Sequence, residues 1–303
     1  MLRPVWISAL TLVVFAVGCN SGKTPAPAPT IAAGPSQAPA KSEPPPTAKR
    51  DVHFKTADGQ MLAGELYLAA DHSAPAVVLV HRQDGTHAEF APLLQRLAKA
   101  DQRFTLLAFD RRGSGTSPPP LHPGKLGPGE LGSQDVRAAI HEVLEQSGGH
   151  ARGVVLVGSS LGAALVSRVA YDEPKVTALA LISPAAAIDG VDVYHPYAQV
   201  RNLPTFLAAS SDDVISRSPM DALSHMAMAG TIKRYSGRYH SAQLMGQAHP
   251  EFWKDLQVWL MGEFDEKPVK RQSLYYAPGK EPGAKAKRLD HIPRKMRAGG
   301  AGK

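Results

Sequence analysis

The chain has 303 residues, of which 43% are hydrophobic, so it can bury one large core or two smaller ones. Its formal net charge is +7, but residues 267–303 contain 11 Lys and Arg against 2 Asp and Glu, which leaves a net charge of −2 for the rest. A nearly neutral body argues against nucleic acid as the partner of the folded part. Cys19 is the only cysteine, which excludes an intrachain disulfide and a thiol nucleophile elsewhere in the chain.

The N-terminus has the features of a bacterial export signal, expected over residues 1–18. Arg3 precedes an apolar segment, 5–17, which is shorter than a membrane-spanning helix. The segment ends in Ala-Val-Gly before Cys19, which resembles a lipobox, where cleavage in front of the cysteine accompanies its lipidation. Conventional signal cleavage is the alternative, because small residues also satisfy that rule. Asn20 in place of an aspartate favours the outer membrane, so the sequence predicts an exported chain attached to a membrane through Cys19.

Two segments of biased composition flank the expected domain. Residues 19–50 are rich in proline and alanine and have few large apolar side chains, which predicts a disordered tether. Residues 264–303 lose hydrophobic periodicity and are dominated by Pro, Gly, Lys and Arg, which predicts a disordered basic tail. The folded domain is therefore expected over residues 51–263.

Strand and helix patterns alternate along this domain. Two short β-type segments, 52–55 and 62–68, are separated by Asp58-Gly59, which is typical of a hairpin. The later expected strands are 76–81, 104–109, 154–157, 176–182, 205–209 and 231–235, and the expected helices are 90–100, 133–145, 160–171, 219–229 and 251–261. This order indicates a mostly parallel α/β sheet covered on both faces, in which active groups gather at the carboxyl ends of the strands.

One of these strands runs into a serine in the spacing Gly-x-Ser-x-Gly. Residues 158–162 read Gly-Ser-Ser-Leu-Gly, between the apolar strand 154–157 and a helical segment. A serine hydroxyl is a poor nucleophile unless a sharp turn exposes it and a base takes its proton. The flanking glycines keep the strand and the helix free of Cβ clashes around such a turn. Ser160 is therefore the candidate nucleophile.

Three motifs after consecutive strands resemble those of the α/β-hydrolases. Residues 81–85, His-Arg-Gln-Asp-Gly, stand where that family has its oxyanion loop, residues 110–117 resemble its Asp-x-Arg-Gly-x-Gly-x-Ser turn, and residues 158–162 resemble its nucleophile turn. The resemblance covers about residues 51–263. It implies a mostly parallel eight-stranded sheet with helices on both faces. Only about twenty residues, 184–203, are available for a cap, so the cap is expected to be minimal, with a small rim from residues 194–197.

The same resemblance assigns an acid and a base. The acid follows the strand 205–209, where the family spacing points to Asp213 and leaves Asp212 as the alternative. The base follows the last strand, where residues 237–241 resemble Gly-x-x-His-Gly and point to His240, with Ser241 in place of the second glycine. His249 is the alternative base, but it stands where the closing helix begins. The resulting order, serine, aspartate, histidine, is that of the α/β-hydrolases.

The oxyanion donors are expected to be the amide of Leu161 and an amide of the loop after His81, from Arg82 or Gln83. Arg82 replaces the usual glycine, so its side chain either crowds the acyl pocket or supplies a positive charge for an anionic substrate. His81 is expected to have a structural role in its loop. Four other histidines are expected to be surface residues without partners: His87, His141, His195 and His225.

These residues predict a serine hydrolase that cleaves a carboxylic ester of a small-molecule acyl substrate through an acyl-enzyme. A peptidase or amidase with the same triad is one alternative, and a non-catalytic surface lipoprotein on a hydrolase scaffold is another. Residues 135–139 and the small cap resemble dienelactone-hydrolase-like and serine-aminopeptidase-like members. No metal-ligand spacing or phosphate-binding glycine loop is found in the sequence, so neither a metal nor a cofactor is expected.

Overall fold

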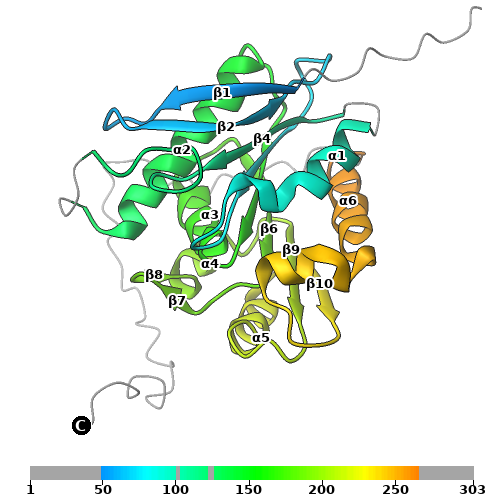
Figure 1. Ribbon diagram of the computed structural model, residues 1–303. Coiled ribbons are helices and arrows are strands. Elements are labelled where there is room, and N and C mark those ends of the chain that lie inside the picture. The colour runs from blue at the N-terminus through cyan, green and yellow to red at the C-terminus, as the bar shows by residue number, and fades with distance from the viewer. Residues whose placement is uncertain (1–48, 100–102, 122–125, 266–303) are drawn as a thin grey trace, which may run out of the picture. The chain divides into compact units, whose positions relative to one another are not determined.

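The fold is an eight-stranded sheet between two layers of helices (Figure 1). A computed structural model describes residues 49–99, 103–121 and 126–265. Residues 1–48, with the expected signal, Cys19 and nearly all of the expected tether, and residues 266–303, with nearly all of the expected basic tail, lie outside the described residues. Within the described part, no helix is both long and apolar enough to cross a membrane.

The sheet has the strand order β1-β2-β4-β3-β5-β6-β9-β10. Its strands are β1 (Lys49–Lys55), β2 (Met61–Tyr67), β3 (Ala76–Val80), β4 (Thr105–Asp110), β5 (Val154–Ser159), β6 (Val176–Ile182), β9 (Thr205–Ser210) and β10 (Gly230–Tyr235). The β1–β2 and β2–β4 pairs are antiparallel, and every pair from β4 to β10 is parallel. The expected mostly parallel eight-stranded sheet is confirmed.

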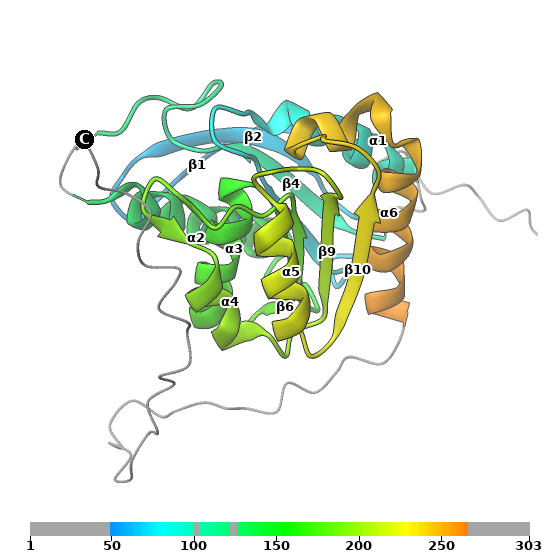
Figure 2. The same ribbon diagram turned by 90° about the horizontal axis from the view of Figure 1, so that it is seen from below.

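The helices cover the two faces of this sheet (Figure 2). One face packs against α2 (Pro128–Gln146), α3 (Leu161–Asp172), α4 (Tyr194–Val200) and α5 (Arg217–Met226). The other packs against η1 (His87–Phe90), α1 (Ala91–Lys99), η3 (Leu244–Ala248), a single π-helical turn, and α6 (Pro250–Asp265); the short turn η2 (Ser241–Gln243) precedes η3. The boundaries of this folded unit differ slightly from expectation, because β1 begins at Lys49 and α6 ends at Asp265.

The central strands have continuous apolar sequences because both of their faces are buried. All five residues of β3 are buried. Val78 belongs to the core under α2 and α3, whereas Val77 and Leu79 belong to the core under α1 and α6. A strand covered by helices on both faces has no solvated side on which polar residues would be favoured.

Helix α2 begins at Pro128, five residues before the expected start at 133. Glycine has a low helix propensity, so the sequence of this first part does not predict a helix. Close packing nevertheless requires glycine at these positions. A Cβ atom on Gly129 would lie 2.8 Å from a methyl group of Val191, and one on Gly132 would lie 2.9 Å from the methyl groups of Leu165. Glycine at these two positions lets α3 and the segment around Val191 approach the backbone of the early turns of α2.

The segment 184–203 forms a two-stranded hairpin, β7 (Ala187–Ile188) and β8 (Val191–Asp192), followed by α4. Helix α4 packs against α3. Tyr197 is fully buried in the core. The expectation that Tyr197 belongs to a small rim is therefore wrong, because its side chain is part of the hydrophobic core.

Candidate active site

Ser160 lies at the turn between β5 and α3. The strand ends at Ser159 and the helix begins at Leu161, so the whole change of direction falls on Ser160. Its backbone has φ 53° and ψ −110°, in a region that residues with a Cβ atom rarely adopt. Such a strained turn presents a serine hydroxyl beyond the end of the sheet.

The glycines on either side of this turn are required by backbone contacts. A Cβ atom on Gly158 would lie 2.4 Å from the carbonyl oxygen of Gly162. A Cβ atom on Gly162 would lie 2.2 Å from the carbonyl oxygen of Val80. Both distances are far below van der Waals contact, so any larger residue would force the strand and the helix apart. The reason for the Gly-x-Ser-x-Gly spacing is thus visible in the packing.

The structure brings Ser160, His240 and Asp213 together from three separate loops. The Oγ atom of Ser160 lies 3.0 Å from Nε2 of His240, and Nδ1 of His240 lies 2.7 Å from Oδ2 of Asp213. Asp213 follows β9, and His240 lies between β10 and η2. The three side chains share the carboxyl edge of the parallel strands, where active groups gather in open α/β sheets. The imidazole has a hydroxyl at one nitrogen and a carboxylate at the other.

Asp213 and its neighbour Asp212 have opposite environments. Asp213 is 2% exposed, whereas the side chain of Asp212 is exposed and makes no hydrogen bond to His240. Burial raises the pKa of Asp213, but the hydrogen bonds from His240 and Ser216 outweigh it, and the net result is a lowered pKa. The Oδ1 atom of Asp213 also accepts a hydrogen bond from the amide of Ile215 at 3.1 Å, which fixes the carboxylate.

His249, the alternative base, makes its hydrogen bonds to residues other than Ser160. Its Nδ1 is 2.8 Å from a carboxylate oxygen of Glu251, and its Nε2 is 2.7 Å from the carbonyl oxygen of Ser236. The ring packs against Tyr235 and Tyr239. Burial lowers its pKa, but the bond to Glu251 and the bond to the Ser236 carbonyl raise it more. Both ring nitrogens are therefore occupied by acceptors other than Ser160.

The loop after β3 is held by hydrogen bonds to the backbone carbonyl and amide of Arg82. The carbonyl oxygen of Arg82 lies 2.7 Å from Nδ1 of His81 and 3.1 Å from Nη2 of Arg111, and it accepts the amide of Gly85 at 3.2 Å. A trans peptide directs its N–H opposite to its C=O, so these three donors also set the direction of the Gln83 N–H. The amide of Arg82 itself donates to Oε1 of Glu89 at 3.1 Å. Of the two expected loop donors, only Gln83 has no such partner among the hydrogen bonds of the described residues.

His81 has the structural position expected of it. It is fully buried, and its Nε2 accepts the amide of Arg111 at 3.0 Å while Nδ1 faces the Arg82 carbonyl. Burial and the nearby Arg111 lower the pKa of His81 to about 3. The ring therefore stays neutral near pH 7, with the proton on Nδ1.

His87 is a correction to the sequence-based expectation of a surface residue without a partner. Its Nδ1 lies 2.9 Å from Oδ1 of Asp110, and its amide donates to the same oxygen at 2.8 Å. Nothing in the local sequence indicates this pair, because 23 residues separate the two side chains. The expectation holds for the exposure of His141, His195 and His225, although Nδ1 of His225 bonds the Asp221 carbonyl.

Ser241 has the backbone conformation that explains the glycine of the family pattern. Its φ is 52°, a left-handed value that favours glycine. Its amide donates to the hydroxyl of Ser183 at 2.9 Å, and its own hydroxyl forms a short hydrogen bond with the hydroxyl of Ser159. The substitution of serine for glycine thus adds a side chain that contacts the nucleophile turn.

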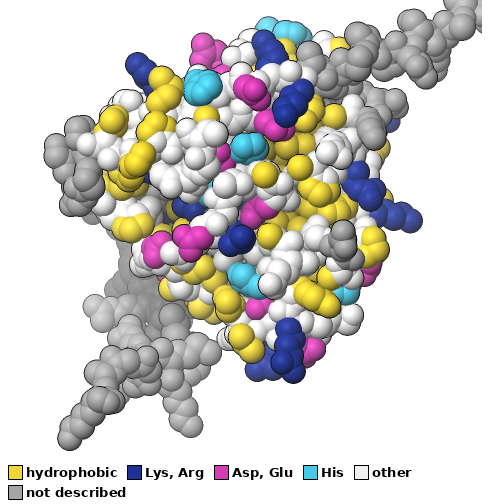
Figure 3. Space-filling model, viewed as in Figure 1, with side chains coloured by type: hydrophobic (Ala, Val, Ile, Leu, Met, Phe, Trp, Pro, Cys, Tyr) yellow, Lys and Arg dark blue, Asp and Glu magenta, His cyan; other side chains and the backbone are white. Residues whose placement is uncertain are grey.

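The surroundings of the triad combine charged and apolar groups. The side-chain amide of Gln83 donates to the carboxylate of Asp189, in the β7–β8 turn, at 3.1 Å. Val214, Ile215 and Tyr239, which neighbour the acid and the base in sequence, are exposed hydrophobic residues. On the face drawn in Figure 3, hydrophobic side chains are interspersed with acidic, basic and histidine side chains.

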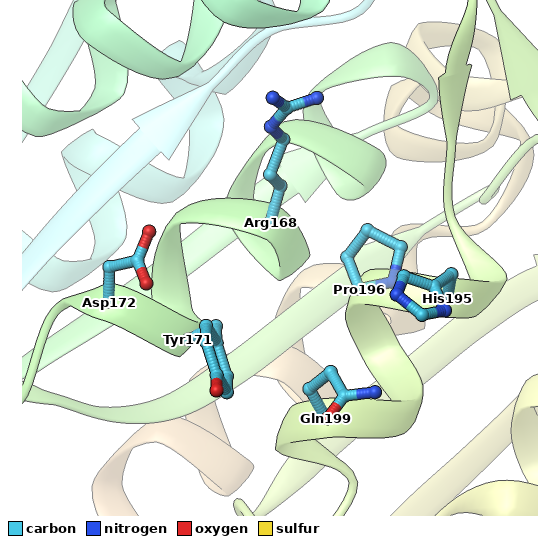
Figure 4. A pocket seen from close by; sticks show the side chains of 6 residues that line it. All are labelled: Arg168, Tyr171, Asp172, His195, Pro196 and Gln199. Atoms are coloured by element: carbon cyan, nitrogen blue, oxygen red, sulfur yellow. The ribbon is translucent and has the colours of Figure 1, made fainter. Parts of the chain in front are cut away.

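A separate hollow of about 440 Å³ lies between α3 and α4 (Figure 4). Its lining residues are Arg168, Tyr171, Asp172, His195, Pro196 and Gln199. Those from α3 belong to its C-terminal end, whereas Ser160 precedes its N-terminus, about 12–18 Å away at the helical rise per residue. The hollow is therefore not part of the Ser160 site. Among the described residues, no group of His, Cys, Asp or Glu side chains is arranged to hold a metal ion.

Comparisons with known proteins agree with this architecture. Residues 77–300 match the model of the alpha/beta hydrolase family. Two uncharacterised proteins, from two strains of Mycobacterium tuberculosis, are each 31% identical over 211 residues, which cover 62% of this chain and 70% of each relative. An esterase of Pyrococcus furiosus has a similar structure, with a TM-score of 0.59 at 16% identity, covering 71% of this chain and 91% of that one.

A second esterase structure, from Exiguobacterium antarcticum, has a TM-score of 0.55 at 12% identity and covers 70% of this chain and all of that one. At such identities these structures establish the fold alone. The family assignment depends on the sequence matches, because the family model spans well over half of the chain. The chain therefore belongs to the alpha/beta hydrolase family.

Proposed function

We propose that this protein is a serine hydrolase that cleaves carboxylic esters of small molecules, with Ser160 as nucleophile, His240 as base and Asp213 as the orienting acid. The observation that carries the proposal is that the three side chains are joined by two consecutive hydrogen bonds. The strained turn presents the Ser160 hydroxyl 3.0 Å from one nitrogen of His240, and Asp213 lies 2.7 Å from the other. Hydrogen-bonded nucleophile, base and orienting carboxylate are the requirements of acyl transfer.

In the acylation step, Nε2 of His240 takes the proton of Ser160 while Oγ attacks the ester carbonyl carbon. The carbon becomes tetrahedral, and its oxygen carries the negative charge. The protonated His240 then gives its proton to the leaving alkoxide as the carbon–oxygen bond breaks, and an acyl-enzyme and an alcohol result. Asp213 keeps the Nδ1–H tautomer and stabilises the imidazolium, and its lowered pKa keeps it ionised.

Two backbone amides are proposed to bind the oxyanion. Leu161 is in the first turn of α3, whose amides have no partner within the helix and lie at the positive end of its dipole. Gln83 supplies the second N–H, because the Arg82 carbonyl on the same peptide is held by three donors. The amide of Arg82, the other expected loop donor, is not included in the proposal, because it already donates to Glu89. Donors fixed before the reaction cost no reorganisation when the charge develops.

Deacylation uses the same groups in the reverse direction. His240 takes a proton from a water molecule, whose oxygen attacks the acyl carbon. The Ser160–acyl bond then breaks, Ser160 recovers its proton from His240, and the carboxylic acid leaves. The products are one alcohol and one acid for each ester, and no cofactor enters the balance.

Ester substrates are favoured over amides because the two structural neighbours described above are both esterases. The same triad supports peptidase or amidase chemistry, and a non-catalytic lipoprotein would need none of it. Membership of the dienelactone-hydrolase-like or serine-aminopeptidase-like group remains a prediction from residues 135–139 and the small cap.

The test is labelling with a fluorophosphonate probe together with hydrolysis of p-nitrophenyl acetate and butyrate and of the matching p-nitroanilides. We expect the wild type to be labelled and to hydrolyse the esters faster than the anilides. Ser160→Ala abolishes both signals, whereas the control Ser224→Ala, on α5, leaves them unchanged. An unlabelled, inactive wild type contradicts catalysis, labelling of Ser160→Ala contradicts the nucleophile, and faster anilide cleavage selects the amidase.

We also propose that the chain is exported and anchored to a bacterial membrane, with the outer membrane favoured, through a lipid on Cys19. The support is the sequence of residues 1–20 alone. Expression in a bacterial host with radiolabelled palmitate tests it. The wild type should incorporate label and sediment with outer membranes, whereas Cys19→Ala should do neither. Secretion of an unlabelled wild type contradicts lipidation and selects conventional signal cleavage.

A further inference from the structure

Glu89 is a buried carboxylate that the proposed reaction does not use. It belongs to the short helix η1, directly after the oxyanion loop, and its side chain is 6% exposed. One oxygen, Oε1, accepts the amide of Arg82 at 3.1 Å, and the other, Oε2, is buried without a hydrogen bond and lies 3.5 Å from Nε of Arg82. The carboxylate also packs on Gly85, where an added Cβ atom would come within 3.1 Å of Oε2.

Ser159, the residue before Ser160, is the member of the nucleophile turn that affects this carboxylate. Burial has the largest effect and raises the pKa of Glu89 to about 7, whereas the amide and the charge of Arg82 and, after them, the Ser159 hydroxyl lower it. The same Ser159 hydroxyl forms the short hydrogen bond with Ser241, and both side chains are fully buried. Ser159 immediately precedes Ser160, and Ser241 immediately follows His240.

Two hydrogen bonds, together with the effect of Ser159 on the pKa of Glu89, relate three segments around Ser160. Glu89 holds the first peptide of the oxyanion loop, Ser159 belongs to the nucleophile turn, and Ser241 belongs to the loop of the base. The amide of Ser241 also binds the hydroxyl of Ser183, at the end of β6. Each hydroxyl has one donor proton, so if Ser241 donates to Ser159, the Ser159 proton is available for another acceptor.

We propose that Glu89 is a positioning residue of the Ser160 reaction, which aligns the oxyanion loop with the nucleophile and base loops through Ser159 and Ser241. The proposal rests on the proposed function of Ser160. Burying a carboxylate that is incompletely hydrogen-bonded is unfavourable, so stability alone does not explain it at this position. Its effect is indirect, because Glu89 contacts the peptide next to the Gln83 N–H rather than the reacting atoms.

The connection predicts a specific kinetic defect. Loss of the carboxylate frees the Arg82 amide and lets the loop rotate, which weakens binding of the oxyanion more than binding of the neutral ester. Glu89→Ala should therefore lower kcat about 10- to 100-fold, with KM changed less than about threefold. Glu89→Gln keeps a carbonyl acceptor for the Arg82 amide and should retain kcat within about fivefold of the wild type.

The experiment measures kcat and KM for p-nitrophenyl acetate, and hydrogen–deuterium exchange by mass spectrometry, for the wild type and four variants. They are Glu89→Ala, Glu89→Gln, Ser241→Gly, which removes the hydroxyl of the connection, and the control Glu130→Ala at an exposed position of α2. Glu89→Ala should exchange faster in peptides over residues 81–86 and 239–244, and Ser241→Gly faster over 239–244 with kcat lowered about 3- to 10-fold. Glu130→Ala should match the wild type in all respects.

Each part of the proposal has a result that would overturn it. Unchanged kcat in Glu89→Ala, or an equal loss of kcat in Glu89→Ala and Glu89→Gln, overturns the positioning role. Faster exchange confined to residues 81–86 overturns the connection to the base loop. If the wild type does not hydrolyse the ester, the proposed function fails and the kinetic role of Glu89 fails with it, while the exchange data still decide whether the three loops are coupled.

Discussion

The molecule contains two histidine–aspartate pairs of similar geometry at the carboxyl edge of its sheet. In the first, Nδ1 of His240 lies 2.7 Å from Asp213. In the second, Nδ1 of His87 lies 2.9 Å from Asp110, the last residue of β4. Both carboxylates are almost completely buried, and both histidines are partly buried. The contact between imidazole and carboxylate does not by itself distinguish a catalytic pair from a structural one.

The two pairs differ at Nε2, the second ring nitrogen of each histidine. Nε2 of His240 faces the hydroxyl of Ser160, whereas Nε2 of His87 lies 3.7 Å from a carboxylate oxygen of Glu65. The hydrogen bond to Asp110 raises the pKa of His87, and the charges of Asp110 and Glu65 raise it further against the effect of burial. When it is protonated, His87 is a cation between two carboxylates and ties η1 to β4 and β2, and its raised pKa favours this form. A proton-accepting base needs a free lone pair directed at a nucleophile, and only the first pair provides one.

The largest expected effect is the loss of activity on removing the first histidine. His240→Ala should lower kcat/KM for p-nitrophenyl acetate about 10³- to 10⁴-fold, because Ser160 loses its base. His87→Ala should lower it less than tenfold. Steady-state kinetics of the two variants measure the contrast, with circular dichroism to show that both are folded. Equal losses would mean that His87 also acts in the reaction.

The two aspartates should separate activity from stability. Asp213→Asn should lower kcat about 10²- to 10⁴-fold, because an amide in place of the carboxylate favours the wrong tautomer of His240. Asp110→Asn should instead lower the free energy of unfolding by about 2–4 kcal/mol, with kcat within tenfold. Its Oδ2 accepts both the amide and the hydroxyl of Thr116, and an amide nitrogen there would face these donors. Urea unfolding and steady-state kinetics measure both quantities; a stable but inactive Asp110→Asn would refute the distinction.

The second pair should make stability depend on pH. The pKa of His87 is raised above 6.5 in the folded state, so its contribution is fully present below about pH 6.5 and is lost as the pH rises through the folded pKa. The free energy of unfolding of the wild type should exceed that of His87→Gln by about 1 kcal/mol at pH 5.5 and by less at pH 9. Urea titrations of both proteins at the two pH values test this. A difference that grows with pH would contradict the cationic state.

The smallest effect is expected at the neighbour of the proposed acid. Asp212 is exposed and makes no hydrogen bond to His240, so Asp212→Asn should keep kcat within about twofold of the wild type. It is the matched control for Asp213→Asn, with the same chemical change one residue away. Comparable losses in the two variants would show that the loop, rather than one carboxylate, sets the activity.

Much of the site was predictable because its residues follow strands that the sequence identifies. Ser160, Asp213 and His240 were expected from motif spacing, and the structure places them within hydrogen-bonding distance of one another. The choice between Asp213 and Asp212 was left open, because adjacent residues have the same charge and differ only in direction. Burial of Asp213 and exposure of Asp212 separate them.

Other features depend on contacts between distant segments and had no local signal. His87 and Asp110 meet because β3 and β4 are paired in the sheet, and the η1 segment with Glu89 follows β3, which also pairs with β5. The start of α2 at Pro128 depends on Val191 and Leu165, which require its glycines. Tyr197 has an amphipathic side chain, and only the packing of α4 decides that its ring is buried.

By itself, the sequence determined the order of the eight main strands and of five helices, the apolar character of the buried strands and the glycine-bounded serine turn, because these follow from periodicity and local backbone sterics. The tertiary structure alone decided which histidine faces the serine, which aspartate is buried and which loop amide is occupied by Glu89. Hydrogen bonds depend on differences of a few tenths of an ångström and on direction, and these are set only when strands far apart in the chain share one edge of the sheet.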